Sequence, residues 1–588
     1  METAPFTTEI SRHIWDSKYR FRDGAGSGDA CVEDSWQRVA RALASVEAHN
    51  RELWAQRFYS ALEDFKFLPG GRILAGAGTG HRVTLFNCFV MGHIDDSMDG
   101  IFDALKEGAL TMQQGGGVGY DFSPLRPSGS AARTVGVTAS GPVSFMHIWD
   151  AMCATILSTG ARRGAMMATL RCDHPDILEF VRAKRDPAKL RHFNLSVLVT
   201  DAFIQAVKEG AQWPLVFPAS GTPGAQIVRS IGARMLWDEI MRATYDYAEP
   251  GVLFIDRINT QNNLRYAETL AATNPCGEIP LPHYGACNLG SINLTRFVRH
   301  AFTPSAAMDF SALENLVPLA VRMLDNVCDV SQFPLPKQAD AVHATRRLGL
   351  GITGLGDALI MLGLRYDSEA AQTASARIMQ RICETAYRAS IELAQEKGVF
   401  PLLDRDQHAQ SPFIQRLSTD IREGLLKHGI RNSHLTAIAP TGTISLLANN
   451  ISSGLEPVFQ RDYRRWITEP DGTRREYAVT DYAVALFRTL HGEDAALPAA
   501  FVTANDIAPR HHLDMQAALQ PWVDNAISKT INVPADLPFA EFQSLYEYAY
   551  EKGLKGCTTF RPNAVTGQVL IETEQEASHC CSVEREGD

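Results

Sequence analysis

A short loop in the middle of the chain combines an amide, a thiol and a carboxylate in the order Asn274-Pro275-Cys276-Gly277-Glu278. Pro275 and Gly277 exclude a regular helix, so the pattern predicts an irregular loop, where catalytic groups often lie. The carboxylate can accept a proton, the amide can orient a hydroxyl, and the cysteine can act as a nucleophile or carry a radical. A lone cysteine is also often a small buried apolar side chain, so the loop alone leaves both interpretations open.

Two further cysteines are candidates for the same chemistry. Cys287 follows the loop cysteine by eleven positions, and Cys88 lies far upstream in an Asn-Cys-Phe-Val sequence that begins at Asn87. The chain has 11 cysteines and no Cys-x-x-Cys pair, which is too sparse for a disulfide scaffold, and we predict no metal site. The cysteines are therefore expected to be reduced thiols. We expect any pair that does oxidise to be catalytic rather than structural.

Two glycine-containing motifs are candidate ligand contacts. Four glycines occur in five residues at 115–119, and they allow either a close approach of a ligand to the backbone or a simple turn. The second motif follows a predicted strand at 435–439 and consists of Pro440, Thr441, Gly442, Thr443, Ile444 and Ser445. Its backbone N–H groups and hydroxyls can bind a phosphate, or it can be a capped helix start without a ligand. It is not a Walker motif, because no Gly-Lys-Ser/Thr follows.

The composition indicates a folded protein and excludes some functions. The 588 residues include 67 acidic and 56 basic side chains, which gives a net charge of −11 and argues against binding of nucleic acid through general charge. With 45% hydrophobic and 21% charged residues the chain resembles ordinary globular proteins. It has neither a run of about 18 apolar residues nor a signal-peptide core, so we predict a cytoplasmic protein without a membrane span.

The local patterns predict helices and strands in alternation. Apolar residues at helical spacing in 36–68 indicate a helical N-terminal region, and strands are predicted at 193–200 and 251–255. Asp201 is expected to cap the next helix and Gly210 to end it. A helix from about residue 540 to Gly553 leads into a short strand at 557–560. The alternation favours an α/β architecture such as a barrel.

Taken in order, these motifs resemble the large subunit of ribonucleotide reductase. The resemblance rests on the Asn-x-Cys-x-Glu loop, the two other cysteines, the glycine-rich run leading to Phe-Ser-Pro-Leu-Arg at 122–126, and the turn at 440–445, and it spans residues 69–563. It implies a ten-stranded α/β barrel with a central finger loop, preceded by a helical N-terminal region. The expected divisions are a helical region at 1–84, the catalytic barrel at 85–565, and a C-terminal tail with a cysteine pair at 566–588.

The resemblance also implies roles for the site residues. A thiyl radical on Cys276 would take hydrogen from the 3′ carbon of the ribose, Glu278 would accept the 3′ hydroxyl proton, and Asn274 would orient the ribose hydroxyls. Cys88 and Cys287 would supply two reducing equivalents and end as a disulfide. The substrate, expected to be a ribonucleoside diphosphate, would contact Asn87, Gly117, Pro440, Thr441, Gly442, Thr443 and Ile444.

Within that family the sequence favours the class that depends on adenosylcobalamin. Class I large subunits carry adjacent tyrosines near the end of the barrel to relay a radical from a metal-bearing partner, whereas this chain has Thr558 and Thr559 followed by Phe560. No glycyl-radical sequence occurs near the C-terminus either. A class I large subunit is the first alternative. A non-radical thiol enzyme with His283 as base and a non-catalytic nucleotide-binding regulator are the others.

Regulation and reduction are expected to involve further residues. The segment with Arg162 and Arg163 resembles the site for deoxynucleotide or ATP effectors at a homodimer interface, and a solvated basic turn is the alternative. Cys580 and Cys581 resemble the tail pair that thioredoxin or a similar dithiol reduces. Because these two cysteines are adjacent, a disulfide between them would be strained, and a remnant of a metal-binding site is the competing interpretation.

Overall fold

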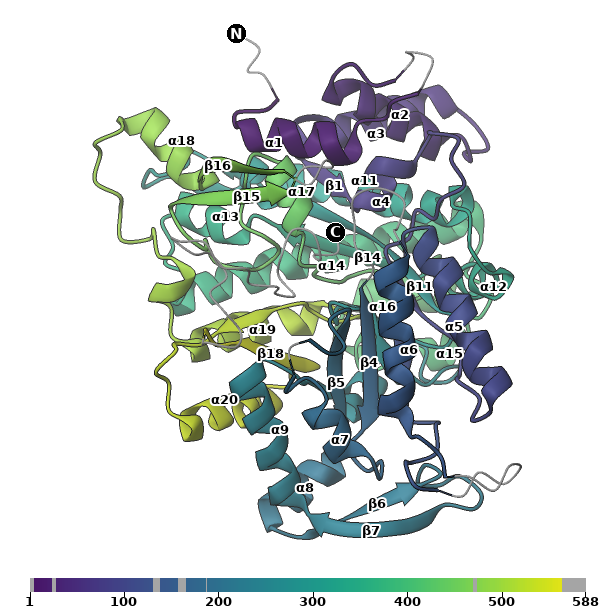
Figure 1. Ribbon diagram of the computed structural model, residues 1–588. Coiled ribbons are helices and arrows are strands. Elements are labelled where there is room, and N and C mark those ends of the chain that lie inside the picture. The colour runs from purple at the N-terminus through teal and green to yellow at the C-terminus, as the bar shows by residue number, and fades with distance from the viewer. Residues whose placement is uncertain are drawn as a thin grey trace.

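A computed structural model of the chain describes residues 5–23, 28–130, 138–156, 165–186, 188–468 and 473–562 (Figure 1). Four helices precede the main sheet or flank its first strand: α1 (Glu9–Ile14), α2 (Val32–Ala44), α3 (Arg51–Leu62) and α4 (Gly71–Gly76). The helical N-terminal region is thus confirmed. Within 36–68 the region contains most of α2 and all of α3, which are separated at residues 45–50 and pack against each other.

The main sheet has ten strands. They are β1 (Phe67–Pro69), β2 (Cys88–Val90), β3 (Gly117–Asp121), β4 (Met166–Arg171), β5 (Phe193–Val199), β8 (Gly251–Phe254), β11 (Ala286–Asn293), β14 (Leu348–Thr353), β17 (Thr530–Asn532) and β18 (Gly556–Phe560). The strand order is β1-β11-β2-β3-β4-β5-β8-β18-β17, and β14 pairs with β11. Strands β2, β3, β4, β5 and β8 are parallel neighbours, and the sheet changes direction where β11 meets β2 and where β18 meets β8.

The pairing of these strands does not close into a continuous barrel. Between β14 and β17, however, the segment 435–439 forms two isolated parallel bridges, Leu350 with Thr436 and Ile438 with Ile527. Residues 435–439 are the third strand predicted from the sequence. They pair on each side through a single bridge rather than through a regular ladder of hydrogen bonds. The prediction of an α/β barrel with a central loop and a helical N-terminal region is confirmed.

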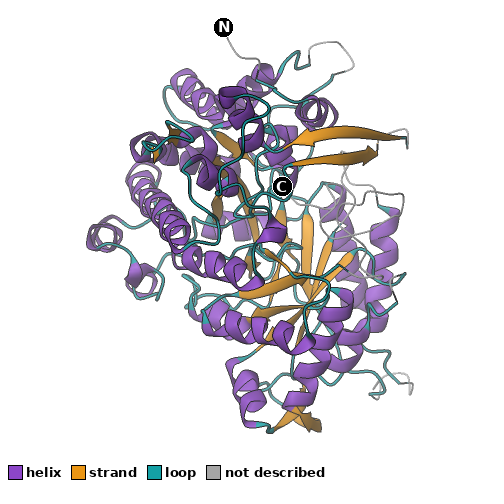
Figure 2. Cartoon of the chain, turned by 90° about the vertical axis from the view of Figure 1, so that its left-hand side faces the viewer, coloured by secondary structure: helices purple, strands orange, loops and turns teal. Residues whose placement is uncertain are grey.

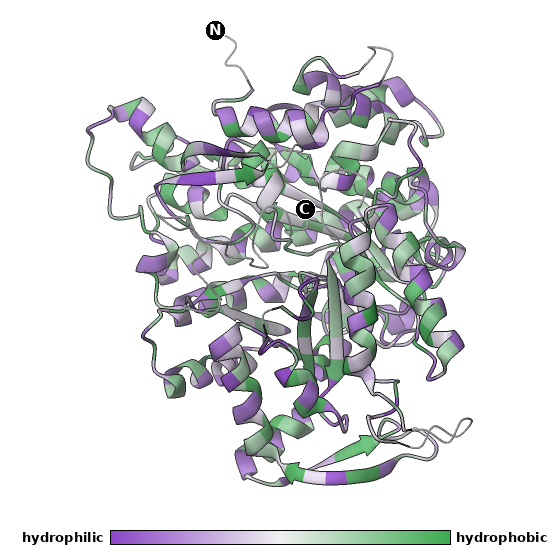
Figure 3. Ribbon diagram, viewed as in Figure 1, coloured by the Kyte–Doolittle hydropathy of each residue, from purple (hydrophilic) through white to green (hydrophobic). Residues whose placement is uncertain are grey.

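Helices surround the strands on the outside (Figure 2). They are α5 (Met98–Gln113), α6 (Pro142–Thr155), α7 (Ile177–Arg182), α8 (Asp201–Glu209), α9 (Ala233–Tyr247), α10 (Ile255–Thr260), α11 (Phe310–Val330), α12 (Pro336–Thr345), α13 (Leu355–Met361), α14 (Glu369–Lys397), α15 (Arg405–Ala409), α16 (Thr419–His428), α17 (Gly442–Leu447), α18 (Tyr482–His491), α19 (Pro509–Leu519) and α20 (Phe539–Glu551). Hydrophobic residues concentrate on the central strands and on the helix faces turned toward them (Figure 3). Among the residues that the structure describes, no helix has the length and hydropathy to span a bilayer.

Four two-stranded hairpins complete the structure. They are β6 (Gln212–Phe217) with β7 (Gln226–Gly232), β9 (Ala272–Thr273) with β10 (Pro280–Leu281), β12 (Val298–Arg299) with β13 (Ala307–Met308), and β15 (Asp462–Thr468) with β16 (Arg474–Thr480). The hairpin β6–β7 lies at one end of the molecule and β15–β16 near the N-terminal helices at the other (Figure 1). The hairpin β9–β10 carries the predicted catalytic loop.

Local predictions are confirmed except for one helix cap. The strand at 193–200 is β5, and the helix after it ends at Gly210, whose φ of 66° is the left-handed conformation that glycine adopts easily. Asp201 was expected to cap this helix, but the cap is Thr200, whose side chain accepts a hydrogen bond from the Phe203 N–H. A hydroxyl one position earlier fulfils the same role, so Asp201 becomes the first helical residue.

A buried ion network joins the N-terminal helices to the barrel. The Glu47 carboxylate accepts hydrogen bonds from Arg322 on α11 at 2.6 and 2.7 Å and from Lys397 at the end of α14 at 3.0 Å, and only 1% of Glu47 is exposed. Burial alone raises the pKa of Glu47, but the hydrogen bonds from Arg322, Asn326 and Lys397 outweigh it and lower that pKa to about 2. The network therefore favours a charged Glu47.

Replacing Glu47 by Gln is expected to lower the free energy of unfolding at pH 7 by about 1 to 3 kcal/mol, because Arg322 and Lys397 lose a buried carboxylate and Arg322 keeps only the half-exposed Glu396. Since the pKa is lower in the folded state, the stabilisation is complete above the ordinary pKa of 4.5 and disappears as the pH falls through about 2. Denaturant unfolding from pH 7 to pH 2 measures this difference, with the exposed Glu52→Gln as control. A variant that is as stable as the parent at pH 7 would contradict the account.

Candidate active site

The predicted catalytic loop is a tight β-turn at the end of the β9–β10 hairpin. The Gly277 N–H donates to the Asn274 carbonyl oxygen at 3.1 Å, which closes a four-residue turn. Asn at the first position, Pro at the second and Gly at the fourth are the residues that such turns favour, and Gly277 has a φ of 82°. The turn therefore presents Cys276 at its third position, where the residue is partly exposed.

Three of the predicted side chains meet next to this turn. The Asn274 Nδ2 donates to Glu278 Oε1 at 2.8 Å and to Cys88 Sγ at 3.2 Å, and Cys88 Sγ lies 3.8 Å from Glu278 Oε1. The Asn274 Oδ1 accepts the Ile279 N–H at 3.0 Å, which fixes the orientation of the amide. Asn274, Cys88 and Glu278 are all buried. An amide, a carboxylate and a thiol are thus in mutual contact next to the turn that carries the partly exposed Cys276.

The second and third cysteines lie opposite each other on neighbouring strands. Cys88 on β2 pairs with Cys287 on β11 in antiparallel register, so their side chains are on the same face of the sheet. Opposite residues in such strands have Cα atoms about 4.5 to 5.5 Å apart, within the roughly 4.4 to 6.8 Å that a disulfide spans. Both are free thiols, and burial raises the pKa of Cys287 well above its ordinary value despite the opposing charge of Arg347. The pair can oxidise without movement of the strands.

The glycine-rich run makes room for the finger loop. A side chain at Gly119 would place its Cβ 1.9 Å from the Thr273 carbonyl oxygen, and one at Gly117 would lie 3.2 Å from the Pro275 ring. Gly117 also donates its N–H to the Asn87 carbonyl at 2.8 Å, so two residues predicted to bind substrate lie side by side next to the turn. The glycines on β3 are needed because the catalytic hairpin passes directly against this strand.

Replacing Gly119 by Ala is expected to displace the root of the finger loop and to lower the free energy of unfolding by about 1 to 3 kcal/mol, because the new methyl group overlaps the Thr273 carbonyl. Catalytic turnover should fall as well, since Cys276 lies three residues beyond Thr273. Thermal unfolding and a turnover assay measure both effects. Gly424→Ala within α16 is the control, because its Cβ makes only ordinary contacts. Parent-like stability and turnover for Gly119→Ala would refute this packing.

The turn at 440–445 leads from the same buried cluster into α17. Ala437 and Ala439 pack in one apolar cluster with Cys88 and Cys287, which brings the turn next to the cysteine pair. Thr441 has a φ of 54° and does not cap α17 with its side chain, so the interpretation as a simple capped helix is not supported. Its hydroxyl instead contacts Thr353 at 2.9 Å and accepts the Gly454 N–H at 2.7 Å. Within the described part of the chain, the N–H groups of residues 442–444 have no acceptor.

Sequence reasoning missed two residues that hold the finger loop. Asn194 on β5 donates its amide to the Pro275 carbonyl at 2.8 Å, and Arg347 donates to the Pro280 carbonyl at 2.8 Å while paired with Glu268. The available signal was a polar side chain within a buried apolar run, although it names no partner. Arg162, Arg163, Cys580 and Cys581 lie outside the described residues, so their predicted roles stay predictions.

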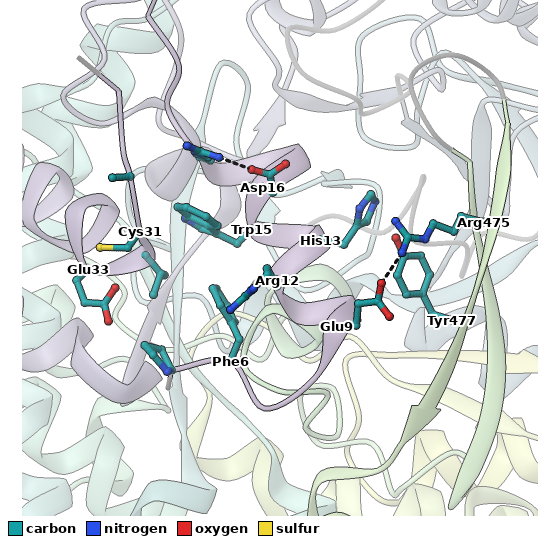
Figure 4. A pocket seen from close by; sticks show the side chains of 14 residues that line it. Phe6, Glu9, Arg12, His13, Trp15, Asp16, Cys31, Glu33, Arg475 and Tyr477 are labelled. Carbon is teal, nitrogen blue, oxygen red and sulfur yellow. Dashed lines mark hydrogen bonds and ion pairs between the residues drawn. The ribbon is translucent and has the colours of Figure 1, made fainter. Parts of the chain in front are cut away.

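A cavity of about 580 Å³ lies away from all of these groups, between α1 and β16 (Figure 4). Its walls include Trp15 and Tyr477, and Glu9 forms an ion pair there with Arg475. None of the predicted catalytic residues lines this cavity. Its side chains are largely paired with one another, and the chemistry predicted from the sequence belongs to the finger loop.

Comparison with known families matches almost the whole chain. The ribonucleotide reductase barrel domain matches residues 86–560, and the all-alpha domain of the same enzyme matches residues 5–82. These two matches adjoin at the start of β2, and together they include every residue of the site described above.

Individual relatives of the chain are also named as reductases of ribonucleotides. A vitamin B12-dependent ribonucleoside-diphosphate reductase of Mycobacterium tuberculosis strain H37Rv is 38% identical over 574 residues, which cover 94% of this chain and 77% of the relative. One of Thermoplasma acidophilum is 35% identical over 534 residues, 88% of this chain and 66% of the relative. A ribonucleoside-diphosphate reductase subunit alpha of Chlamydia pneumoniae is 25% identical over 633 residues, 94% of this chain and 59% of the relative. The chain belongs to the ribonucleotide reductase family.

Proposed function

We propose that this protein reduces ribonucleoside diphosphates to 2′-deoxyribonucleotides by a thiyl-radical mechanism that depends on adenosylcobalamin. The observation that carries the proposal is the contact of Asn274, Glu278 and Cys88 next to the Cys276 turn, with Cys287 opposite Cys88. Two relatives named vitamin B12-dependent ribonucleoside-diphosphate reductases are 38% and 35% identical, others named vitamin B12-dependent ribonucleotide reductases are 28 to 29% identical, and the subunit alpha is 25% identical. These values favour the cobalamin-dependent class over a class I large subunit.

The proposed mechanism gives one step to each group. The Cys276 sulfur, as a thiyl radical, removes hydrogen from the ribose 3′ carbon, and Glu278 accepts the 3′ hydroxyl proton. Asn274 holds the carboxylate by its amide and is placed to orient the ribose hydroxyls. The 2′ hydroxyl leaves as water with a proton from one of the two thiols, and Cys88 and Cys287 together supply two electrons and two protons and become a disulfide. Glu278 then returns its proton to the 3′ oxygen and Cys276 returns its hydrogen to the 3′ carbon, which restores the thiyl radical. In sum, a ribonucleotide and a dithiol give a deoxyribonucleotide, a disulfide and water.

In a variant with Cys580→Ser and Cys581→Ser, a single turnover without added reductant is expected to leave a disulfide between Cys88 and Cys287. The physical reason is that these thiols are opposite each other on fixed strands, while Cys153 and Cys328 are buried elsewhere on helices. Alkylation under denaturing conditions followed by peptide mass analysis should find one linked pair for each product formed, with Cys153 and Cys328 still alkylated. Product formed with both Cys88 and Cys287 alkylated would exclude them as the reductant pair.

The turn at 440–445 is the proposed contact for the substrate phosphates. The backbone N–H groups of residues 442–444 have no acceptor within the described residues, and Thr443 adds a hydroxyl. The turn follows the apolar cluster that contains Cys88 and Cys287, so a nucleotide bound there can extend its ribose toward Cys276. Asn87 and Gly117 complete the proposed substrate contacts on the other side of the finger loop.

Two hydroxyls on the sheet near the finger loop are proposed as contacts for the cofactor. Asn194 of β5 points at Pro275, and Ser196 two residues later faces the same side. A side chain at Gly251 would place its Cβ 3.2 Å from the Ser196 hydroxyl and 3.3 Å from that of Thr558, which is tighter than ordinary packing, so glycine at this position leaves the two hydroxyls uncovered. Ser196 and Thr558 would contact the adenosyl group, which supplies the radical chemistry when the cofactor is bound. Thr558 also stands where a class I chain would need a redox-active tyrosine.

Further parts of the proposal rest on the family resemblance alone. They are a homodimer, effector binding of deoxynucleotides or ATP near Arg162 and Arg163, and reduction of the site by thioredoxin or a similar dithiol through Cys580 and Cys581. The divisions at 1–84, 85–565 and 566–588, and a cytoplasmic location, are proposed on the same ground.

The function is tested by incubating the protein with a ribonucleoside diphosphate, a dithiol and adenosylcobalamin, and then omitting the corrin alone. Deoxynucleotide is expected only in the complete mixture. Product without the corrin that needs an added metal-bearing subunit would assign the chain to class I. No product under any of these conditions would refute the proposed function.

A further inference from the structure

We infer that Asn194 is a positioning residue that sets the direction of the Cys276 sulfur, an inference that rests on the proposed radical function. Its Nδ2 donates to the Pro275 carbonyl oxygen at 2.8 Å, across 81 residues of sequence. The acceptor belongs to the peptide bond that joins Pro275 to Cys276. Asn194 therefore holds the backbone group from which the reactive cysteine extends.

The peptide in question is the middle one of the catalytic turn. The hydrogen bond from Gly277 to Asn274 closes the turn but does not constrain rotation of this middle peptide, which is the difference between the two common turn types. Cys276 is not among the residues with positive φ, so the turn has the type that a cysteine tolerates at this position. Rotation of this peptide would move the Cα–Cβ bond of Cys276. The hydrogen bond from Asn194 to the Pro275 carbonyl oxygen resists that rotation.

The donor stands on a rigid element. Asn194 lies in β5, which pairs in parallel with β4 on one side and with β8 on the other, and its partner in β4 is Met167. Groups on strands paired at both edges are held more firmly than groups on loops. Gly117 of β3 also approaches the Pro275 ring. Pro275 is thus contacted from two strands of one sheet.

The position of the Cys276 sulfur sets its distance to the ribose 3′ carbon, and this distance affects the rate of hydrogen transfer. Hydrogen transfer to a sulfur radical needs a close and aligned approach, and a displacement of about 1 Å can cost on the order of 10²-fold in rate. Substrate binding relies on other residues, the turn at 440–445 among them. Loss of the Asn194 bond should therefore lower kcat and leave KM nearly unchanged.

The test uses two variants of Asn194 and a matched control in the full-length chain. In Asn194→Ala the bond is lost, and we expect kcat to fall by roughly tenfold or more with KM unchanged. In Asn194→Asp a carboxylate of the same size faces the Pro275 carbonyl, and we expect a larger loss through repulsion. Gln415→Ala also removes an amide that donates to a backbone carbonyl, that of Ala409 at 2.7 Å, but far from the loop, and it should keep parent-like kcat.

A second readout needs neither cofactor nor turnover. The rate at which iodoacetamide alkylates Cys276 in the apoprotein, followed by peptide mass analysis, should change severalfold in both Asn194 variants and not in Gln415→Ala. Thermal unfolding verifies that all three variants are folded. Parent-like kcat and parent-like alkylation in the Asn194 variants would overturn the inference, as would an equal loss in the control. Failure of the parent to form deoxynucleotide would instead refute the proposed function, and the alkylation rates would still decide the role of Asn194.

Discussion

Replacing Cys276 by Ser is expected to abolish deoxynucleotide formation, with a loss on the order of 10⁴-fold or more. Serine has nearly the same size, so the turn closed by Asn274 and Gly277 should persist. A hydroxyl does not carry the stabilised radical that sulfur carries, so the first hydrogen transfer fails. Turnover is measured with the complete mixture, and binding of the ribonucleoside diphosphate is measured separately by equilibrium titration.

Binding should remain while turnover disappears. Cys31→Ser is the matched control, because Cys31 is an exposed thiol far from the finger loop, and it should be as active as the parent. Full turnover by Cys276→Ser would exclude Cys276 both as the radical carrier and as the nucleophile of a thiol enzyme with His283 as base. A parent protein that binds the nucleotide but forms no product would instead favour the non-catalytic nucleotide-binding regulator.

Replacing Glu278 by Gln is expected to lower kcat by about 10² to 10⁴-fold, the range typical for loss of a general base. Glutamine keeps an oxygen that can accept the Asn274 amide, as Glu278 Oε1 does at 2.8 Å, so the local packing is preserved. What disappears is the capacity to take the 3′ hydroxyl proton. Steady-state kinetics should show the loss in kcat with KM little affected.

The control for this variant is Glu384→Gln, which changes another buried carboxylate on α14, away from the finger loop. Its turnover should match the parent. If Glu278→Gln were as active as Glu384→Gln, proton transfer by Glu278 would be excluded. The contact with Cys88 would then be structural only.

The sequence allowed the finger loop to be predicted because its determinants are local. Proline and glycine around Cys276 exclude a helix and favour the observed turn, and the strand at 193–200 follows from a continuous buried run. The cap before α8 was wrong by one residue because Thr200 and Asp201 are both good capping residues, and only the backbone conformation distinguishes them.

Other parts of the site depend on strand register and could not be predicted locally. Cys88 lies opposite Cys287 because β2 pairs with β11 across about 200 intervening residues, and a shift by one residue would have turned one thiol away. The need for Gly119 arises from the Thr273 carbonyl of a distant hairpin. Asn194 likewise becomes informative only when its partner, the Pro275 carbonyl, is known.

The most direct measurement of the central claim is electron paramagnetic resonance of the protein frozen rapidly during turnover. The account predicts a transient signal that changes when the protein is prepared with cysteine deuterated at the β carbon and that is absent in Cys276→Ser. A fully active sample with no such cysteine-dependent signal, or one with the signal intact in Cys276→Ser, would contradict it.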